Sequence, residues 1–192
     1  MLKYERRLRD MTQDHKILLA THPALRKKAA SVKSVDTDIK KLMMEMTRIM
    51  QEHKGVGLAA TQIGVHKRVL TMDVSHVQEE KPNLFCMANP EIIWRSDEQI
   101  TEKEYCFSVP DIGIPVIRPA EVKVRYVDEH NTKREVHAKG LLARCVQHEI
   151  DHLNGIVTID YLSPLRRKMA IKKLKRMEEN LEEETSLDHP TI

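Results

Sequence analysis

The sequence predicts a single α+β domain, because segments with helical spacing of apolar residues flank a central region with strand-like spacing. The helical patterns cover residues 38–54 and 140–154, and the strand-like runs lie between residues 67 and 137. A chain of 192 residues can bury one core but is too short to suggest two ordinary domains. We therefore expect one domain over residues 1–192.

The first predicted helix begins after Asp36 or Thr37, either of which can cap its N-terminus. Gly55 can adopt the left-handed conformation that often ends a helix, so we expect it to stop this one. The apolar residues between these limits recur with helical spacing and form one face: Ile39, Leu42, Met43, Met46, Ile49 and Met50.

Strand-like runs follow at residues 68–74, 85–95, 100–109, 121–126 and 133–138. Val122, Val124 and Tyr126 alternate with charged residues, and residues 128–132 supply the polar turn of a hairpin. We expect these runs to form antiparallel sheet, with Pro110 interrupting the pairing after the third run.

The chain then returns to helical spacing over residues 140–154, which Gly155 is expected to stop. Ser163 and Pro164 form a favourable cap and first turn for a last helix. This helix is expected to cover residues 163–184, between an N-terminal extension at 1–16 and a tail at 185–192.

The composition narrows the class of protein. A formal net charge of +3 and a pI near 8.7 are too mild to indicate a specific DNA partner. The 3 cysteines cannot all pair and lack the spacing of a secreted disulfide scaffold, so the cytoplasm is the expected location. No stretch approaches the roughly 18 apolar residues of a membrane span, so we expect no membrane partner.

Residues 148–152 read H-E-I-D-H, an H-E-x-x-H pattern on the second predicted helix. His148 and His152 are separated by about one turn, which places both imidazoles on one face, where they can bind one ion. Glu149 is then placed to reach a water on that ion without being a ligand. The chain holds 10 histidines, so one alone means little, but this combination indicates a catalytic metal site.

A catalytic site of this kind needs a third protein ligand and an open position for water. Thr158 stands where a metzincin would have its third histidine, and the Lys- and Arg-rich region beyond it holds no thermolysin-like glutamate. Cysteine is the remaining candidate. Cys106 ends a strand-like run and can present a thiolate, although core packing is its alternative; packing is favoured for Cys86 and Cys145.

Three segments, in order and at matching spacing, resemble the motifs of one family. Residues 55–62 (GVGLAATQ) resemble G-x-G-x-A-A-x-Q, residues 104–110 (EYCFSVP) resemble E-G-C-L-S-x-P, and residues 147–153 (QHEIDHL) resemble Q-H-E-x-D-H-L. These are motifs of the peptide deformylases, and the resemblance covers nearly all of the chain beyond residue 16.

The resemblance implies an H-E-x-x-H helix surrounded by antiparallel sheets, with the C-terminal helix outside. It implies a metal-dependent hydrolase that removes the formyl group from formylmethionine of newly synthesised polypeptides and releases formate. Cys106, His148 and His152 would hold one divalent ion. A thiolate ligand favours softer ions, and we expect Fe²⁺, with Zn²⁺, Ni²⁺ or Co²⁺ as substitutes.

The resemblance also implies how the reaction is catalysed. Glu149 would take up the proton of the attacking water and return it to the departing amine. The Gln62 side chain and the Phe107 backbone N–H would stabilise the developing oxyanion, and both of these roles depend on the resemblance alone.

The chain departs from the family motifs at several positions. Tyr105 replaces glycine, Phe107 replaces leucine, Arg144 replaces an apolar residue, and the segment 111–113 lacks a basic residue. We expect retained chemistry with an altered substrate preference and place Tyr105 at the mouth of the site. Matching positions imply a pocket for the initiating methionine formed by Gly55, Val56, Gly57, Leu141, Cys145 and the aliphatic part of Arg144.

The sequence is also compatible with two other functions. The same metal site could serve another amidase or peptidase. Alternatively, Tyr105 could leave a catalytically weak, ribosome-associated protein. The last helix is a candidate ribosome contact, although a solvated charged face is the simpler interpretation of its basic residues: Arg166, Arg167, Lys168, Lys172, Lys173, Lys175 and Arg176.

Overall fold

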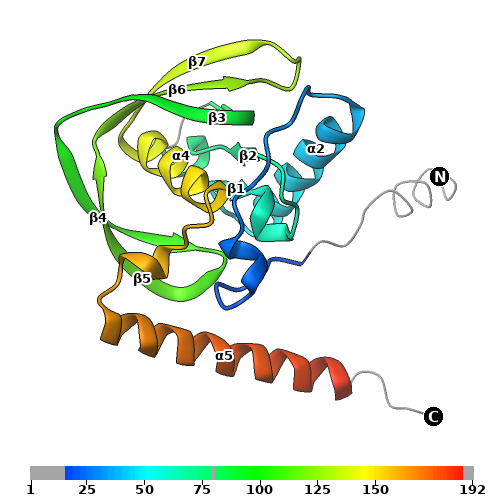
Figure 1. Ribbon diagram of the computed structural model, residues 1–192, viewed down its shortest axis with the longest axis vertical. Coiled ribbons are helices and arrows are strands. Elements are labelled where there is room, and N and C mark those ends of the chain that lie inside the picture. The colour runs from blue at the N-terminus through cyan, green and yellow to red at the C-terminus, as the bar shows by residue number, and fades with distance from the viewer. Residues whose placement is uncertain (1–15, 79–80, 188–192) are drawn as a thin grey trace, which may run out of the picture.

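The computed structural model describes residues 16–78 and 81–187, which form two antiparallel sheets with helices packed around them (Figure 1). Most of the expected N-terminal extension and tail lies outside the described residues. The helices are α2 (Thr37–Glu52), α3 (Ser75–Gln78), α4 (Gly140–Leu153) and α5 (Pro164–Leu187), with short 3-10 helices η1 (Pro23–Arg26), η2 (Ala60–Ile63) and η3 (Thr158–Tyr161). The strands are β1 (Gly57–Ala59), β2 (Val69–Met72), β3 (Phe85–Arg95), β4 (Gln99–Cys106), β5 (Val109–Pro119), β6 (Glu121–Val127) and β7 (Lys133–Lys139).

The five-stranded sheet has the order β1-β2-β3-β6-β7, and each pair of neighbours is antiparallel. Adjacent residues of a strand point to opposite faces, so the sheet contributes to two cores. Leu58 and Ala88 pack with the apolar face of α2. Ala59, Leu70 and Met87 pack with α4 on the other face. The sheet is therefore covered by one helix on each side.

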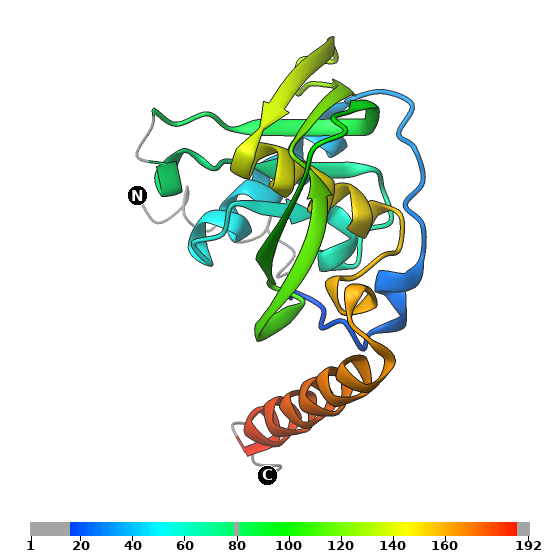
Figure 2. The same ribbon diagram turned by 90° about the vertical axis from the view of Figure 1, so that its left-hand side faces the viewer.

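Helix α4 lies between the five-stranded sheet and the β4–β5 hairpin (Figures 1 and 2). Ten of its 14 residues are buried, including charged ones, because protein covers it on both sides. The expected α+β fold, with the H-E-x-x-H helix surrounded by antiparallel sheets and a C-terminal helix outside, is confirmed.

One local expectation was wrong, and a second held only over a few residues. Gly55 does not stop the first helix through a left-handed conformation; Lys54 has the positive φ, 54°. Gly55 instead leaves room for a ring, since a Cβ there would lie 1.9 Å from Phe107 Cζ. Pro110 interrupts the pairing only locally: Cys106 pairs with Val109 across a two-residue turn, the register shifts between Glu104 and Cys106, and regular pairing resumes at Ile114. A two-stranded sheet consists only of edge strands, where a proline is tolerated.

Helix α5 begins at Pro164, one residue after the expected start, and extends to Leu187, beyond the expected end at residue 184. Its buried residues Ala170 and Leu174 join a third core that contains Cys106. The rest of the helix projects from the body of the molecule (Figure 2). Within the described part of the chain, no helix is long and apolar enough to cross a membrane.

Candidate metal centre

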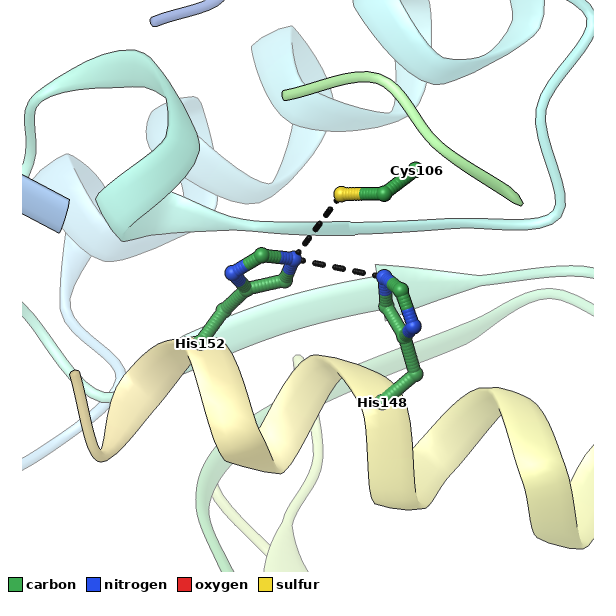
Figure 3. Close-up of side chains that lie close together, drawn as sticks. All are labelled: Cys106, His148 and His152. Carbon is green, nitrogen blue, oxygen red and sulfur yellow. Dashed lines mark hydrogen bonds between the residues drawn. The ribbon is translucent and has the colours of Figure 1, made fainter. Parts of the chain in front are cut away.

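Cys106, His148 and His152 come together in the interior, at the interface between the β4–β5 hairpin and α4 (Figure 3). Cys106 Sγ lies 3.2 Å from His152 Nε2, and His152 Nε2 lies 3.2 Å from His148 Nε2. The two histidines are one helical turn apart, while the cysteine ends β4. All three side chains are buried.

These residues fit a divalent metal ion. Metal–sulfur bonds near 2.3 Å and metal–nitrogen bonds near 2.0 Å in a tetrahedron place neighbouring ligand atoms about 3.3–3.6 Å apart. The Cys106–His152 and His148–His152 distances are close to this range, and the ligand atoms of all three residues lie within 4.8 Å of one another. Glu149 lines the adjacent cavity, and its buried Oε2 has no hydrogen-bond partner among the described residues. Three protein ligands with an open position, and a glutamate placed to act as a general base, are what a catalytic H-E-x-x-H site requires.

Electrostatics favour the protonation states that the chemistry needs. Burial would raise the pKa of the Cys106 thiol, but His152 and His148 outweigh it and hold the pKa well below its usual range. The metal-binding thiolate is therefore favoured. Burial raises the pKa of Glu149 to about 7, assisted by the negative charges of Cys106 and Glu104 and opposed by the two histidines. A carboxylate with a pKa near neutrality is suited to accept and return a proton.

A buried carboxylate, Glu104, orients one of the histidines. Its Oε2 accepts a hydrogen bond from His148 Nδ1 at 2.9 Å, which leaves Nε2 of the ring free for a metal. Arg118 donates to both Glu104 oxygens, at 2.8 and 2.9 Å, and also to Asp151. Burial would raise the pKa of Glu104, but Arg118 and His148 lower it to about 2, so the group is ionised.

Sequence patterns do not reveal this network. Glu104 falls in the E-G-C-L-S-x-P-like segment, but its position there indicates no role by itself. Arg118 gave no local signal, because it lies 14 residues from Glu104 and only the β4–β5 pairing brings the two together. A signal was available in the spacing: Glu104 precedes Cys106 by two residues, which places both on one face of a strand.

Gln62, in η2, is held in a fixed orientation beside the ligands. Its Oε1 accepts from the backbone N–H of Ala59 at 2.7 Å. The amide group Nε2 therefore faces the site, 3.6 Å from Cys106 Sγ and 3.4 Å from Ser108 Oγ. Phe107 follows Cys106 directly, and its ring packs edge-on against His53. Both residues that only the resemblance had suggested lie at the candidate centre.

A cavity of about 660 Å³ opens onto this centre. Every candidate site residue except His152 lines it, so segments far apart in the sequence form one site. Leu141 and Cys145 lie on its wall together with Val56, while Tyr105 is 71% exposed. Arg144 also lines the cavity, although its guanidinium is engaged with β4 and β5.

A buried histidine pair with an adjacent glutamate, open to a cavity, is the arrangement of metal-dependent hydrolases. The geometry places the chain in that class. Residues 14–168 match the model of the polypeptide deformylase family. The chain belongs to this family of peptide deformylases.

Individual relatives agree with this assignment. The peptide deformylase of Phenylobacterium zucineum is 47% identical over 161 residues, which cover 83% of this chain and 94% of the relative. That of Methylocella silvestris is 44% identical over 162 residues, with 83% of each chain covered. The crystal structure of peptide deformylase from Ehrlichia chaffeensis in complex with actinonin superposes with a TM-score of 0.82, at 39% identity, over 87% of this chain and 99% of that one.

Proposed function

We propose that the cavity beside Cys106, His148 and His152 is where this peptide deformylase hydrolyses the formyl group of N-formylmethionyl polypeptides, releasing formate. The observation that carries the proposal is the convergence of one thiolate and two imidazoles, buried together at a cavity with Glu149 beside them. Another amidase or peptidase activity is not favoured, because the family match covers most of the chain.

A divalent ion held by the three ligands would supply Lewis-acid chemistry, lowering the pKa of a water in its open position and polarising the formyl oxygen. The thiolate disfavours hard ions such as Mg²⁺. Among the remaining ions we propose Fe²⁺ in the cell, as the resemblance to the peptide deformylases implies, with Zn²⁺, Ni²⁺ or Co²⁺ as substitutes. His148 is held for this role by Glu104, whose carboxylate fixes the ring tautomer.

The protein's own groups handle the proton and the developing charge. Glu149 accepts a proton from the attacking water and delivers it to the departing amine nitrogen. The Gln62 amide nitrogen and the Phe107 backbone N–H donate to the formyl oxygen as negative charge develops on it. Because Ala59 already fixes the Gln62 side chain, little reorganisation is needed at that moment.

The cavity walls account for recognition of the substrate. Val56, Leu141 and Cys145 offer an apolar surface for the methionine side chain. Beyond it, the Tyr105 ring covers Gly113, where an added Cβ would lie 2.9 Å from Tyr105 Cζ. An aromatic surface therefore stands at the mouth, and we propose that it alters the preference for residues after methionine.

Nascent chains as substrates imply work in the cytoplasm, near ribosomes. The exposed basic residues of α5, including Arg166, Lys172 and Arg176, are the proposed ribosome contact. Pelleting of the full chain with ribosomes at moderate salt tests this contact, and exchange of these three residues for glutamine should abolish it.

The activity is tested by formate release from formyl-Met-Ala-Ser, with acetyl-Met-Ala-Ser as control. We expect formate from the formyl peptide only, loss of activity on chelation, and recovery when Fe²⁺ is restored under anaerobic conditions. Actinonin, which is bound to the Ehrlichia chaffeensis relative in its crystal structure, should compete with the substrate. Absence of metal-dependent formate release would refute the proposal.

A further inference from the structure

The proposed metal centre depends on the relative placement of two separate elements. Cys106 belongs to the β4–β5 hairpin, and both histidines belong to α4. A small shift of the helix along the hairpin would move the sulfur away from the imidazoles. Whatever fastens α4 to the hairpin therefore also sets the ligand geometry.

Arg144 makes such a connection. It lies on α4, one turn before His148, and its side chain is 9% exposed. Its partners all belong to the hairpin. The Nη1 group donates to Glu104 Oε1 at 2.9 Å and to the Val116 carbonyl at 3.1 Å, and Nη2 donates to the Ile100 carbonyl at 2.8 Å. The Nε group pairs with Glu102 at 2.9 Å. One guanidinium thus links the helix to both strands.

The same side chain acts on a ligand through Glu104. Arg144 binds Oε1 of that carboxylate, and His148 Nδ1 binds Oε2. Arg118 also binds Glu104, but both of these residues come from the hairpin. Arg118 reaches α4 through Asp151, near the other end of the H-E-x-x-H segment. Arg144 therefore fastens the His148 end of that segment, and Arg118 the His152 end.

A lysine could not replace this arrangement. A buried cation is costly unless its donors are satisfied, and the planar guanidinium meets two carboxylates and two carbonyls at fixed angles. An ammonium group has three donors around one point and cannot span both strands. An apolar residue would leave Glu102 and Glu104 without this partner.

We propose that Arg144 is a positioning residue of the metal centre. It clamps α4 to the β4–β5 hairpin and holds Glu104 in place, and Glu104 in turn holds His148 beside Cys106. The proposal rests on the proposed metal site. It assigns to Arg144 a role in metal retention, beyond that of a pocket wall. The Glu102 side chain is 58% exposed, so the contacts of Arg144 extend from the buried Glu104 to the surface of the hairpin.

The test compares the full-length wild type with Arg144→Met, which keeps the aliphatic stem, and Arg144→Lys. We expect Zn²⁺ to transfer to a chelator about tenfold faster from Arg144→Met, and several-fold faster from Arg144→Lys, because groups behind metal ligands typically change affinity by about 10–100-fold. The visible spectrum of the Co²⁺-substituted protein should change in both. Arg125→Met, which removes an exposed pair with Glu135 between β6 and β7, is the matched control and should behave as wild type.

Wild-type rates of Zn²⁺ loss with an unchanged Co²⁺ spectrum would overturn the proposal, even if the melting temperature or KM changed. If Arg144→Met does not fold, the test uses Arg144→Lys alone. A wild-type rate of Zn²⁺ loss from that variant then overturns the proposal. Failure of the wild type itself to bind Zn²⁺ or Co²⁺ would instead count against the metal site, so the two failures are distinguishable.

Discussion

The two sides of α4 are both buried, yet they are built in opposite ways. The side facing the five-stranded sheet is apolar and includes Ala143, Val146, Ile150 and Leu153. The side facing the hairpin carries Arg144, His148, Asp151 and His152, each paired with a specific partner.

This difference separates stability from function within one helix. Apolar packing tolerates exchange between side chains of similar volume, because its contacts are non-directional. Buried charges depend on particular partners at particular angles, and removing one partner leaves another uncompensated. Substitutions on the sheet side should therefore change the free energy of unfolding, and those on the hairpin side or at the cavity should change the chemistry.

The largest effect is expected for Glu149→Gln. It removes the proton acceptor at the cavity while keeping the shape of the side chain, so kcat should fall by about 10²–10⁴-fold. Metal content, measured by mass spectrometry of the purified protein, should remain that of the wild type. A variant that retained turnover would contradict the assigned role, and one that lost its metal would make Glu149 a ligand.

The reactivity of the cysteines should also differ between the apolar core and the metal centre. Burial raises the pKa of the Cys86 thiol to about 11. At pH 8, about one Cys86 in 10³ is therefore a thiolate, and its reactivity rises only as the pH approaches 11. Once the metal is chelated, iodoacetamide should modify Cys106 first, with Cys86 labelled only after unfolding. Peptide mass spectrometry over time measures this order, and equal labelling of Cys106 with and without metal would contradict its role as a ligand.

Gly57→Ala tests how closely the backbone approaches the catalytic carboxylate. The added Cβ would lie 2.5 Å from Glu149 Oε1 and 2.8 Å from Cys145 Sγ, so Glu149 must move. A displacement of about 1 Å can cost about 10²-fold, and we expect kcat/KM to fall by that order. Gly113→Ala, whose three nearest contacts are all atoms of the exposed Tyr105 ring, is the comparison variant. It can change binding of residues after methionine through Tyr105 but should keep the wild-type kcat. Equal losses in both would show that the approach to Glu149 has no special importance.

Leu70→Ala addresses the apolar side and should leave the chemistry intact. Leu70 is fully buried in β2 and belongs to the core shared with α4. The free energy of unfolding should fall by about 2–5 kcal/mol, measured by urea denaturation. The kcat per folded molecule should equal that of the wild type. A marked fall in kcat would show that the two sides of α4 are coupled.

Much of the fold was accessible from sequence because periodicity is local. The pattern from residue 38 predicted α2 with Asp36 or Thr37 as its cap, and the structure has Asp36 in that position. The run 85–95 coincides with β3. Residues 100–109 were expected to be one strand, but they contain the turn between β4 and β5. A two-residue turn at Phe107 and Ser108 has no glycine to mark it, so the spacing of apolar residues did not reveal it.

By itself, the sequence determined the α+β class and the placement of His148, Glu149 and His152 on one helix, because residues four apart meet in any helix. Only the tertiary structure brought Cys106 to them, across 46 positions of chain. It also decided that Glu104, Arg118 and Arg144 form the support behind the ligands, and that Gly55 makes room for a ring. These pairings depend on how the hairpin packs against α4, and local spacing carries no information about contacts between distant segments.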